Sequence, residues 1–227
     1  MRAKLHGDFS KYPSEIRDIF RALKAEVLEV RSEWLVYHHL FMEDEQFTQV
    51  MSRGLGGVLG ALQNMLQTNL LLAIARLVDP ATGIKGDKNL SLRNLCEEVP
   101  ANTGTLRKDA TKLLNKIGAA AGNVKFHRHK SIAHYDLEIS LEAKQLPSVT
   151  FREIRRILEQ IEAFLNLFER HFENSETLFT ELPAREITGR CEATVLKALA
   201  YDRLEADGTI SKGEWKRRVN GPLTTEA

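Results

Sequence analysis

Along most of the chain, apolar residues recur every three or four positions, the spacing that gathers them on one face of an α-helix. The first such segment starts at Pro13-Ser14-Glu15, where the Glu15 carboxylate suits a first helical turn, and it continues to about residue 41. A shorter helix is expected from Asp44 to Ser52. The pattern therefore favours an all-α protein from its first fifty residues.

A second long helix is expected over residues 54–79, and Asp79-Pro80 ends it, because the residue before a proline disfavours the α conformation. Its part from Leu62 to Leu77 is apolar on most sides, which predicts a central, buried helix. Glycines stand near its start at positions 54, 56, 57 and 60. Each glycine lowers helix stability, so we expect close approach of another backbone to compensate.

The rest of the chain follows the same helical pattern, interrupted by polar connections. The expected segments are a loop at 80–90, helices over Leu90–Val99, Thr103–Ala121 and Val124–His134, an extended or loop segment at 137–149, a long helix at 151–173 capped by Thr150, a linker at 174–189, a short helix at 190–205 and a polar tail. We therefore expect one helical domain at residues 10–175, with a linker, short helix and tail at 176–227.

Composition limits the classes of protein that remain. The chain has 227 residues, 43% hydrophobic and 28% charged, enough to bury a large core without disulfides or metal. Its formal net charge is +1, so contact with nucleic acid has to come from a local basic patch. Cys96 and Cys191 lack the spacing of a zinc motif, which favours a reducing cytoplasm. The longest apolar stretch, 69–79, is too short to span a bilayer, so no membrane contact is expected.

The segment richest in reactive side chains runs from Phe126 to Asp136, where five of eleven residues are His, Arg or Lys. It holds His127, His129 and His134, three of the chain's seven histidines. Histidine exchanges a proton near neutral pH, and the arginine guanidinium offers a fixed positive fork that suits a phosphate. Together they provide the groups needed for metal-independent cleavage of RNA, in which a base deprotonates the 2′-hydroxyl and a cation stabilises the phosphorane.

Ideal helical spacing does not place all of these side chains on one face. On an ideal helix, His127, Lys130, Ser131 and His134 share one face, whereas Arg128 lies about 120° from His134. Arg128 and His134 therefore converge only through the long arginine side chain, an irregular helix start or a two-fold axis. Asp136 is placed to orient the His134 imidazole.

The spacing Arg128-x5-His134, in the fuller form Arg128-x-Lys130-x2-Ala133-His134-x-Asp136, resembles the signature of the HEPN superfamily, and especially its AbiU-type (abortive-infection) domains. Trp34, Leu40-Phe41 and the run Ala75-Arg76-Leu77-x-Asp79 extend the resemblance over about residues 10–175.

The resemblance implies an all-α HEPN-like helical bundle that dimerises, with the motifs of two protomers lining one cleft. It also implies a metal-independent endoribonuclease acting as a toxin or phage-defence effector, with RNA as substrate and a separate antitoxin protein as a partner. On this basis Arg128 and His134 are the catalytic pair. Lys130 and Asp136 are supporting positions by the same resemblance, and His127 and His129 accompany them in the motif.

Other interpretations of the same residues remain open. His134 and Asp136 also suit a structural hydrogen-bonded pair, and the whole chain suits a non-catalytic module that binds RNA or protein. Arg76 and Asp79 are expected to form an ion pair at the end of their helix, or alternatively to lie beneath the motif and position it. No cofactor or metal is expected, because the three motif histidines lack an added carboxylate ligand on a shared face.

Overall fold

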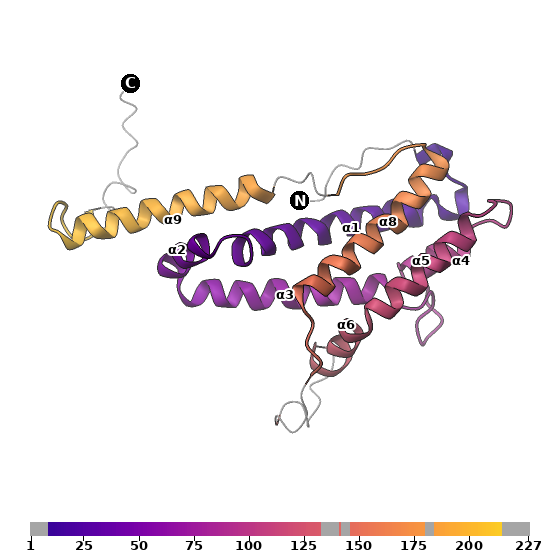
Figure 1. Ribbon diagram of the computed structural model, residues 1–227, viewed down its shortest axis with the longest axis horizontal. Coiled ribbons are helices and arrows are strands. Elements are labelled where there is room, and N and C mark those ends of the chain that lie inside the picture. Colours follow the sequence, from indigo (N-terminus) through magenta and orange to yellow (C-terminus); the bar gives the residue numbers. More distant parts are fainter. Residues whose placement is uncertain (1–8, 133–140, 142–145, 180–183, 215–227) are drawn as a thin grey trace. The chain divides into compact units, whose positions relative to one another are not determined.

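The computed structural model describes residues 9–132, 141, 146–179 and 184–214, and these residues form helices joined by turns. Apart from an isolated bridge between Thr82 and Lys88, the described residues contain no β-structure, which confirms the all-α prediction. The elements are η1 (Phe9–Lys11), α1 (Ser14–Phe41), α2 (Glu45–Leu55), α3 (Gly57–Leu77), α4 (Leu92–Glu98), α5 (Leu106–Ala120), α6 (Gly122–His127), the π-helix η2 (Arg128–Ile132), α8 (Phe151–Phe172) and α9 (Ala184–Ala206) (Figure 1).

Side-chain caps fix the starts of several helices. The Asp44 carboxylate accepts the backbone N–H groups of Gln46 and Phe47 at the start of α2. Thr150 and Glu153 form a reciprocal capping box that begins α8, as the sequence predicts. These caps satisfy N–H groups that have no partner within the helix, so each start is set by a single polar residue.

The chain divides into two compact units. The larger unit consists of residues 1–35 and 64–182, and the smaller unit consists of residues 36–63 and 183–227. The long helices α1 and α3 each contribute residues to both units. These units are defined by their compactness and do not test the domain expected at residues 10–175, which stays a prediction.

The core of the larger unit lies where α8 crosses α1 and packs along α5 (Figure 1). The Phe20 ring on α1 stacks on Phe168 of α8 with centroids 5.9 Å apart, and Trp34 is buried beside Phe151. Other fully buried side chains of these two helices are Ile16, Leu23, Val27, Leu158, Ile161, Phe164 and Leu165. The apolar stripes that predicted α1 and α8 therefore face each other.

Two buried ion pairs join the same helices. Lys24 Nζ lies 2.6 Å from Glu169 Oε1, and Arg31 Nε lies 3.2 Å from Glu162 Oε1. Burial raises the pKa of Glu162 to about 7, although the Arg31 guanidinium acts in the opposite direction. A buried charge that loses its partner destabilises a fold strongly, so these pairs fix the register of α1 against α8.

In the smaller unit, α2 packs against α9. Gly54 makes this possible, because a Cβ at that position would lie 2.5 Å from Val195 Cγ1. Gly54 belongs to α2, not to the start of the next helix, and Gly56 separates the two helices with a positive φ of 49°. A Cβ at Gly57 or Gly60 would meet nothing within 4 Å. Close approach therefore explains Gly54 alone, and its neighbour is a side chain, not a backbone.

Helix α3 is buried over only part of its length. Leu70, Ile74 and Leu77 are at most 1% exposed, but Leu62 and Met65 are 38% and 66% exposed. The prediction of burial from Leu62 onward is therefore wrong for its first two turns. By length and composition α3 could cross a membrane, contrary to the expectation from the shorter apolar stretch, but the core helix of a water-soluble protein meets the same criterion.

The C-terminal helix begins earlier than expected. Helix α9 starts at Ala184, so residues 184–189 are helical instead of part of a linker. Its Val195 side chain is buried, and it is the side chain that packs against Gly54 of α2.

Candidate functional site

Arg128 opens a π-helix. Helix α6 ends at His127, and residues Arg128–Ile132 continue as η2, in which hydrogen bonds span one residue more than in an α-helix. The face predicted for His127, Lys130, Ser131 and His134 assumes an ideal α-helix, whereas the described part of this segment changes from α- to π-helical at Arg128. His134 and Asp136 lie outside the described residues, so their approach to Arg128 stays a prediction.

The Arg128 guanidinium forms an ion pair with Asp79, which lies just beyond the buried end of α3. Nη1 of Arg128 donates to Oδ1 of Asp79, and the side chains are 37% and 21% exposed. Forty-nine positions separate the two residues in sequence. Of the two alternatives for Asp79, the structure supports the one in which this carboxylate positions the motif.

Arg76 has a different partner. Its Nη2 lies 2.9 Å from Oε1 of Glu26 on α1, and it makes no ion pair with Asp79. The predicted ion pair between Arg76 and Asp79 is therefore wrong. The turn at the end of α3 sends the two side chains to different neighbours, although the Asp79 N–H still donates to the Arg76 carbonyl at 3.2 Å.

These two ion pairs line one pocket of about 450 Å³. Its walls are Glu26, Arg76, Leu77, Asp79, Asn89, Leu90 and Arg128. Two guanidinium groups thus face a single space, each already held by one carboxylate. An arginine that is oriented by one partner keeps N–H donors for a second acceptor, so the pocket suits a phosphate group.

Asn89 closes one wall of the pocket from the loop at 80–90. Its backbone N–H donates to the Ala81 carbonyl at 2.8 Å, and its amide Nδ2 donates to the Pro80 carbonyl at 2.9 Å. These bonds fold the loop back on the residues that follow Asp79. The wall beside Arg128 is therefore held by the backbone that immediately follows α3.

A sequence model of the HEPN class, that of the AbiU2 family, matches residues 13–188. The chain belongs to the AbiU2 family of HEPN domains. No curated protein and no solved structure matches it. The matched residues include α1, the end of α3, the Arg128 motif and α8, so the resemblance noted in the sequence is confirmed at the level of the family.

Within this AbiU2 domain, His127 has a structural contact. Its Nε2 donates to the Pro147 carbonyl at 2.5 Å, and Asn123 Nδ2 donates to the Ser148 carbonyl at 3.4 Å. Both bonds tie α6 to the segment that leads into α8. This bond fixes the orientation of the His127 ring and leaves its Nδ1 as the nitrogen that could accept a proton. His129 is exposed and Lys130 is half-buried on η2.

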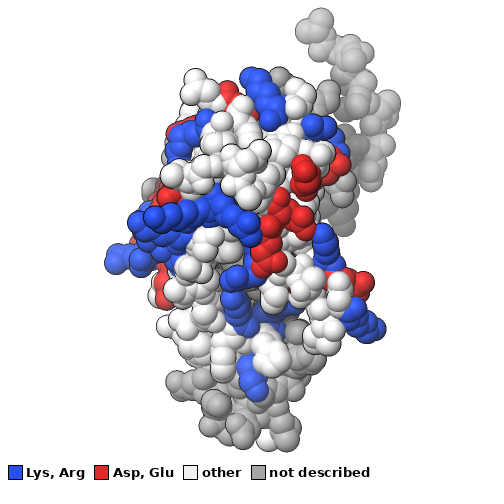
Figure 2. All heavy atoms as spheres, turned by 90° about the vertical axis from the view of Figure 1, so that its right-hand side faces the viewer, with Lys and Arg blue, Asp and Glu red and all other residues white. Residues whose placement is uncertain are grey.

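A basic surface lies on the same AbiU2 domain. Figure 2 views the side on which α4 and α5 lie in Figure 1, and Lys and Arg side chains gather there in a band. Helix α5 exposes Lys108, Lys112 and Lys116 at four-residue spacing, which places them on one face. This helix leads through α6 directly to Arg128. The net charge of +1 therefore conceals a local patch of the kind that contact with RNA requires.

Sequence reasoning missed Glu26 and Asn89. Glu26 lies fifty positions from Arg76, and a single sequence contains no signal that links them. Asn89 carries a detectable signal, because an asparagine shortly before the Ser91 helix cap is typical of side-chain bonding to a turn.

Proposed function

We propose that this AbiU2-family protein is a metal-independent endoribonuclease. The observation that supports the proposal most directly is the Arg128 guanidinium, held by Asp79 at a pocket of phosphate-accepting size. The catalytic pair is Arg128 with His134, and Lys130 and Asp136 support it. His129 and His127 are supporting positions on the motif, and the Pro147 contact orients the His127 ring.

The proposed reaction is an internal transfer at phosphorus. His134 removes the 2′-hydroxyl proton, the 2′-oxygen attacks the adjacent phosphorus, and the bond to the 5′-oxygen breaks with a proton supplied to that leaving oxygen. The products are a 2′,3′-cyclic phosphate and a 5′-hydroxyl end. Arg128 stabilises the charge that develops on the phosphorane, a contribution separate from the proton transfers.

Asp79 acts in this scheme as a positioning residue. Its carboxylate neutralises Arg128 before substrate arrives, and a phosphate then takes the guanidinium donors that Asp79 leaves open. An oriented arginine loses less freedom when it binds a phosphate, so the Asp79 contact assists the charge stabilisation.

In the cell, the proposed role is that of a cytoplasmic toxin or phage-defence effector, held inactive by a separate antitoxin protein and active as a homodimer. The exposed apolar side chains Val58, Leu62 and Met65 on α3 support self-association, since clustered exposed apolar residues mark interaction surfaces. Light scattering on a size-exclusion column tests the dimer, and Met65→Glu is expected to shift it toward monomer.

The deciding experiment incubates purified protein with total RNA in EDTA and maps new RNA ends. Arg128→Ala and His134→Ala are expected to abolish cleavage that leaves a 2′,3′-cyclic phosphate. Arg21→Ala is the matched control for the arginine, because Arg21 also pairs with an aspartate, Asp18, on an exposed surface. His171→Ala is the control for the histidine. Full activity in both motif variants would overturn the proposal.

A second candidate is a non-catalytic module that binds RNA through the same surface. The observation in its favour is the pairing of Arg128 and Arg76 with carboxylates, which leaves the pocket close to neutral. Under this candidate, folded protein retards RNA in a gel without producing new ends, and Lys112→Ala with Lys116→Ala weakens that binding.

A further inference from the structure

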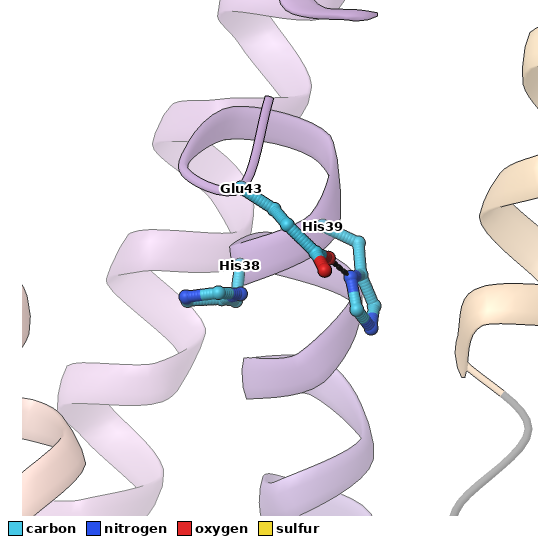
Figure 3. A group of neighbouring side chains, drawn as sticks. All are labelled: His38, His39 and Glu43. Atoms are coloured by element: carbon cyan, nitrogen blue, oxygen red, sulfur yellow. Dashed lines mark hydrogen bonds and ion pairs between the residues drawn. The ribbon is translucent and has the colours of Figure 1, made fainter. Parts of the chain in front are cut away.

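The last turn of α1 carries two adjacent histidines, His38 and His39, and Glu43 lies just beyond it (Figure 3). One possible ligand atom from each of the three side chains lies within 4.8 Å of the others. In Figure 3 the Glu43 carboxylate is directed at the His39 ring, where Oε2 contacts Nδ1, and the His38 ring lies on the other side of the carboxylate. All three residues belong to the smaller unit.

The end of α1 brings these side chains together. Neighbouring residues of an ideal helix point about 100° apart, so His38 and His39 alone do not converge on one atom. Here the backbone N–H groups of both Met42 and Glu43 donate to the His38 carbonyl, at 2.9 and 3.0 Å. Because one carbonyl accepts both N–H groups, the chain turns back over the final turn of α1. Glu43 is thereby carried to the side where both imidazoles are within reach.

The surroundings leave room for further ligands. A pocket of about 520 Å³ adjoins His39 and Glu43, and its lining includes Glu45 of α2 and Glu192 of α9. The His39 side chain is 12% exposed and that of Glu43 is 35% exposed. A cation held by the three residues would thus be partly shielded from solvent, with an open side toward additional carboxylates or water.

We propose that His38, His39 and Glu43 bind a divalent transition-metal ion of the zinc type. Imidazole nitrogens with one carboxylate are a donor set that suits Zn²⁺, whereas Mg²⁺ and Ca²⁺ prefer oxygen ligands alone. The ion would join the last turn of α1 to the start of α2. It has a structural role and is separate from the Arg128 pocket, which belongs to the larger unit.

The simpler explanation is a hydrogen bond between His39 and Glu43, four residues apart, with no metal. That pair alone does not need His38. The two explanations therefore differ in what His38→Ala does to zinc binding, because only the metal site needs His38 as a ligand.

The test uses the full chain without a histidine tag, stripped with a chelator and then freed of it, and titrates ZnCl₂ by calorimetry. One Zn²⁺ per chain is expected to bind, and His38→Ala and His39→Ala are each expected to weaken binding by more than about 100-fold, because even loss of an outer partner costs about 10–100-fold. Glu43→Gln keeps the shape of the side chain and is expected to weaken binding in the same way. MgCl₂ is expected to give no binding.

Two control variants each remove a side chain that lies outside the proposed site but is of a type able to bind Zn²⁺. His171→Ala deletes a histidine of the larger unit, and Cys191→Ser deletes the exposed thiol of α9. Both are expected to bind Zn²⁺ like the parent. CoCl₂ adds a spectroscopic measurement, since Co²⁺ in a site of this kind absorbs visible light and the band disappears in Glu43→Gln. Absence of Zn²⁺ binding by folded protein, or unchanged binding in His38→Ala, would overturn the proposal without bearing on RNA cleavage.

Discussion

Both halves of α3 carry large apolar side chains, but the two halves have different environments. From Leu70 to Leu77 the helix lies in the core of the larger unit, and it ends shortly before Asp79, the aspartate that holds Arg128. From Gly57 to Gln63 it belongs to the smaller unit, where Val58 is 60% exposed, and Met65 shortly after is 66% exposed. Hydrophobicity alone therefore does not show which half forms the core.

The largest expected effect tests this difference in burial. Ile74→Ala removes a fully buried side chain and is expected to lower the free energy of unfolding by about 2–5 kcal/mol. Met65→Ala is the matched change in the exposed half, and its expected effect is below about 0.5 kcal/mol. Urea unfolding followed by circular dichroism measures both. Equal losses would show that the exposed half is covered in solution, for example by a second copy.

The next effect concerns Asp79, just beyond the buried half of α3. Asp79→Ala is expected to lower the rate constant of RNA cleavage by about 10–100-fold, because Arg128 loses the carboxylate that orients it. Glu26→Gln, which removes the charge from the partner of Arg76, serves as the control in the same pocket. Single-turnover cleavage of a defined RNA separates the rate constant from binding. A change in affinity with an unaltered rate constant would contradict the positioning role.

The larger unit also contains charges inside its core, and these predict a pH dependence. The folded-state pKa of Glu162 is about 7, above its ordinary value of 4.5, so the folded state binds the proton more tightly. The resulting stabilisation is complete below about pH 4.5 and is lost as the pH rises through 7. The difference in unfolding free energy between wild type and Glu162→Gln is expected to change by about 1–3 kcal/mol between pH 5 and pH 8. Chemical unfolding at both pH values measures it, and a constant difference would contradict the raised pKa.

The smallest effects are expected in the smaller unit, at Gly54 of α2 and Gly60 of α3. Gly60→Ala places a methyl group in open space and is expected to stabilise the protein by about 0.5–1 kcal/mol. Gly54→Ala meets Val195 and is expected to destabilise it by about 1–2 kcal/mol. Thermal unfolding of both variants, and of Gly54→Ala combined with Val195→Ala, checks the contact. If the double variant shows no recovery, Val195 is not the cause.

Much of the fold was predictable because it depends on neighbours in the sequence. The starts of α2 and α8 follow from Asp44 and Thr150, whose side chains bond to backbone a few residues away. The partners of Arg128 and Arg76 were not predictable with certainty, because each pair joins residues about fifty positions apart. The site could be located from its histidines and arginine, but its geometry depends on tertiary contacts.

Local rules also fail where a helix departs from its regular form. The convergence of His38 and His39 on Glu43 needs the turn at the end of α1, and ideal helical spacing argues against it. The register of the motif likewise depends on η2, for which the sequence offered only the idea of an irregular helix. Such features follow from packing around the helix, so periodicity does not report them.

The π-helix at Arg128–Ile132 has a consequence for how this motif can change over evolutionary time. A π turn is equivalent to an α-helical turn with one inserted residue, so deletion of a single residue there would restore the α-helical phase. The described residues on either side of the deletion would then keep nearly the same rotation about the helix axis, because the wider π turn had absorbed the extra residue. The length of this motif could therefore change by one codon at the π turn without interrupting the helix.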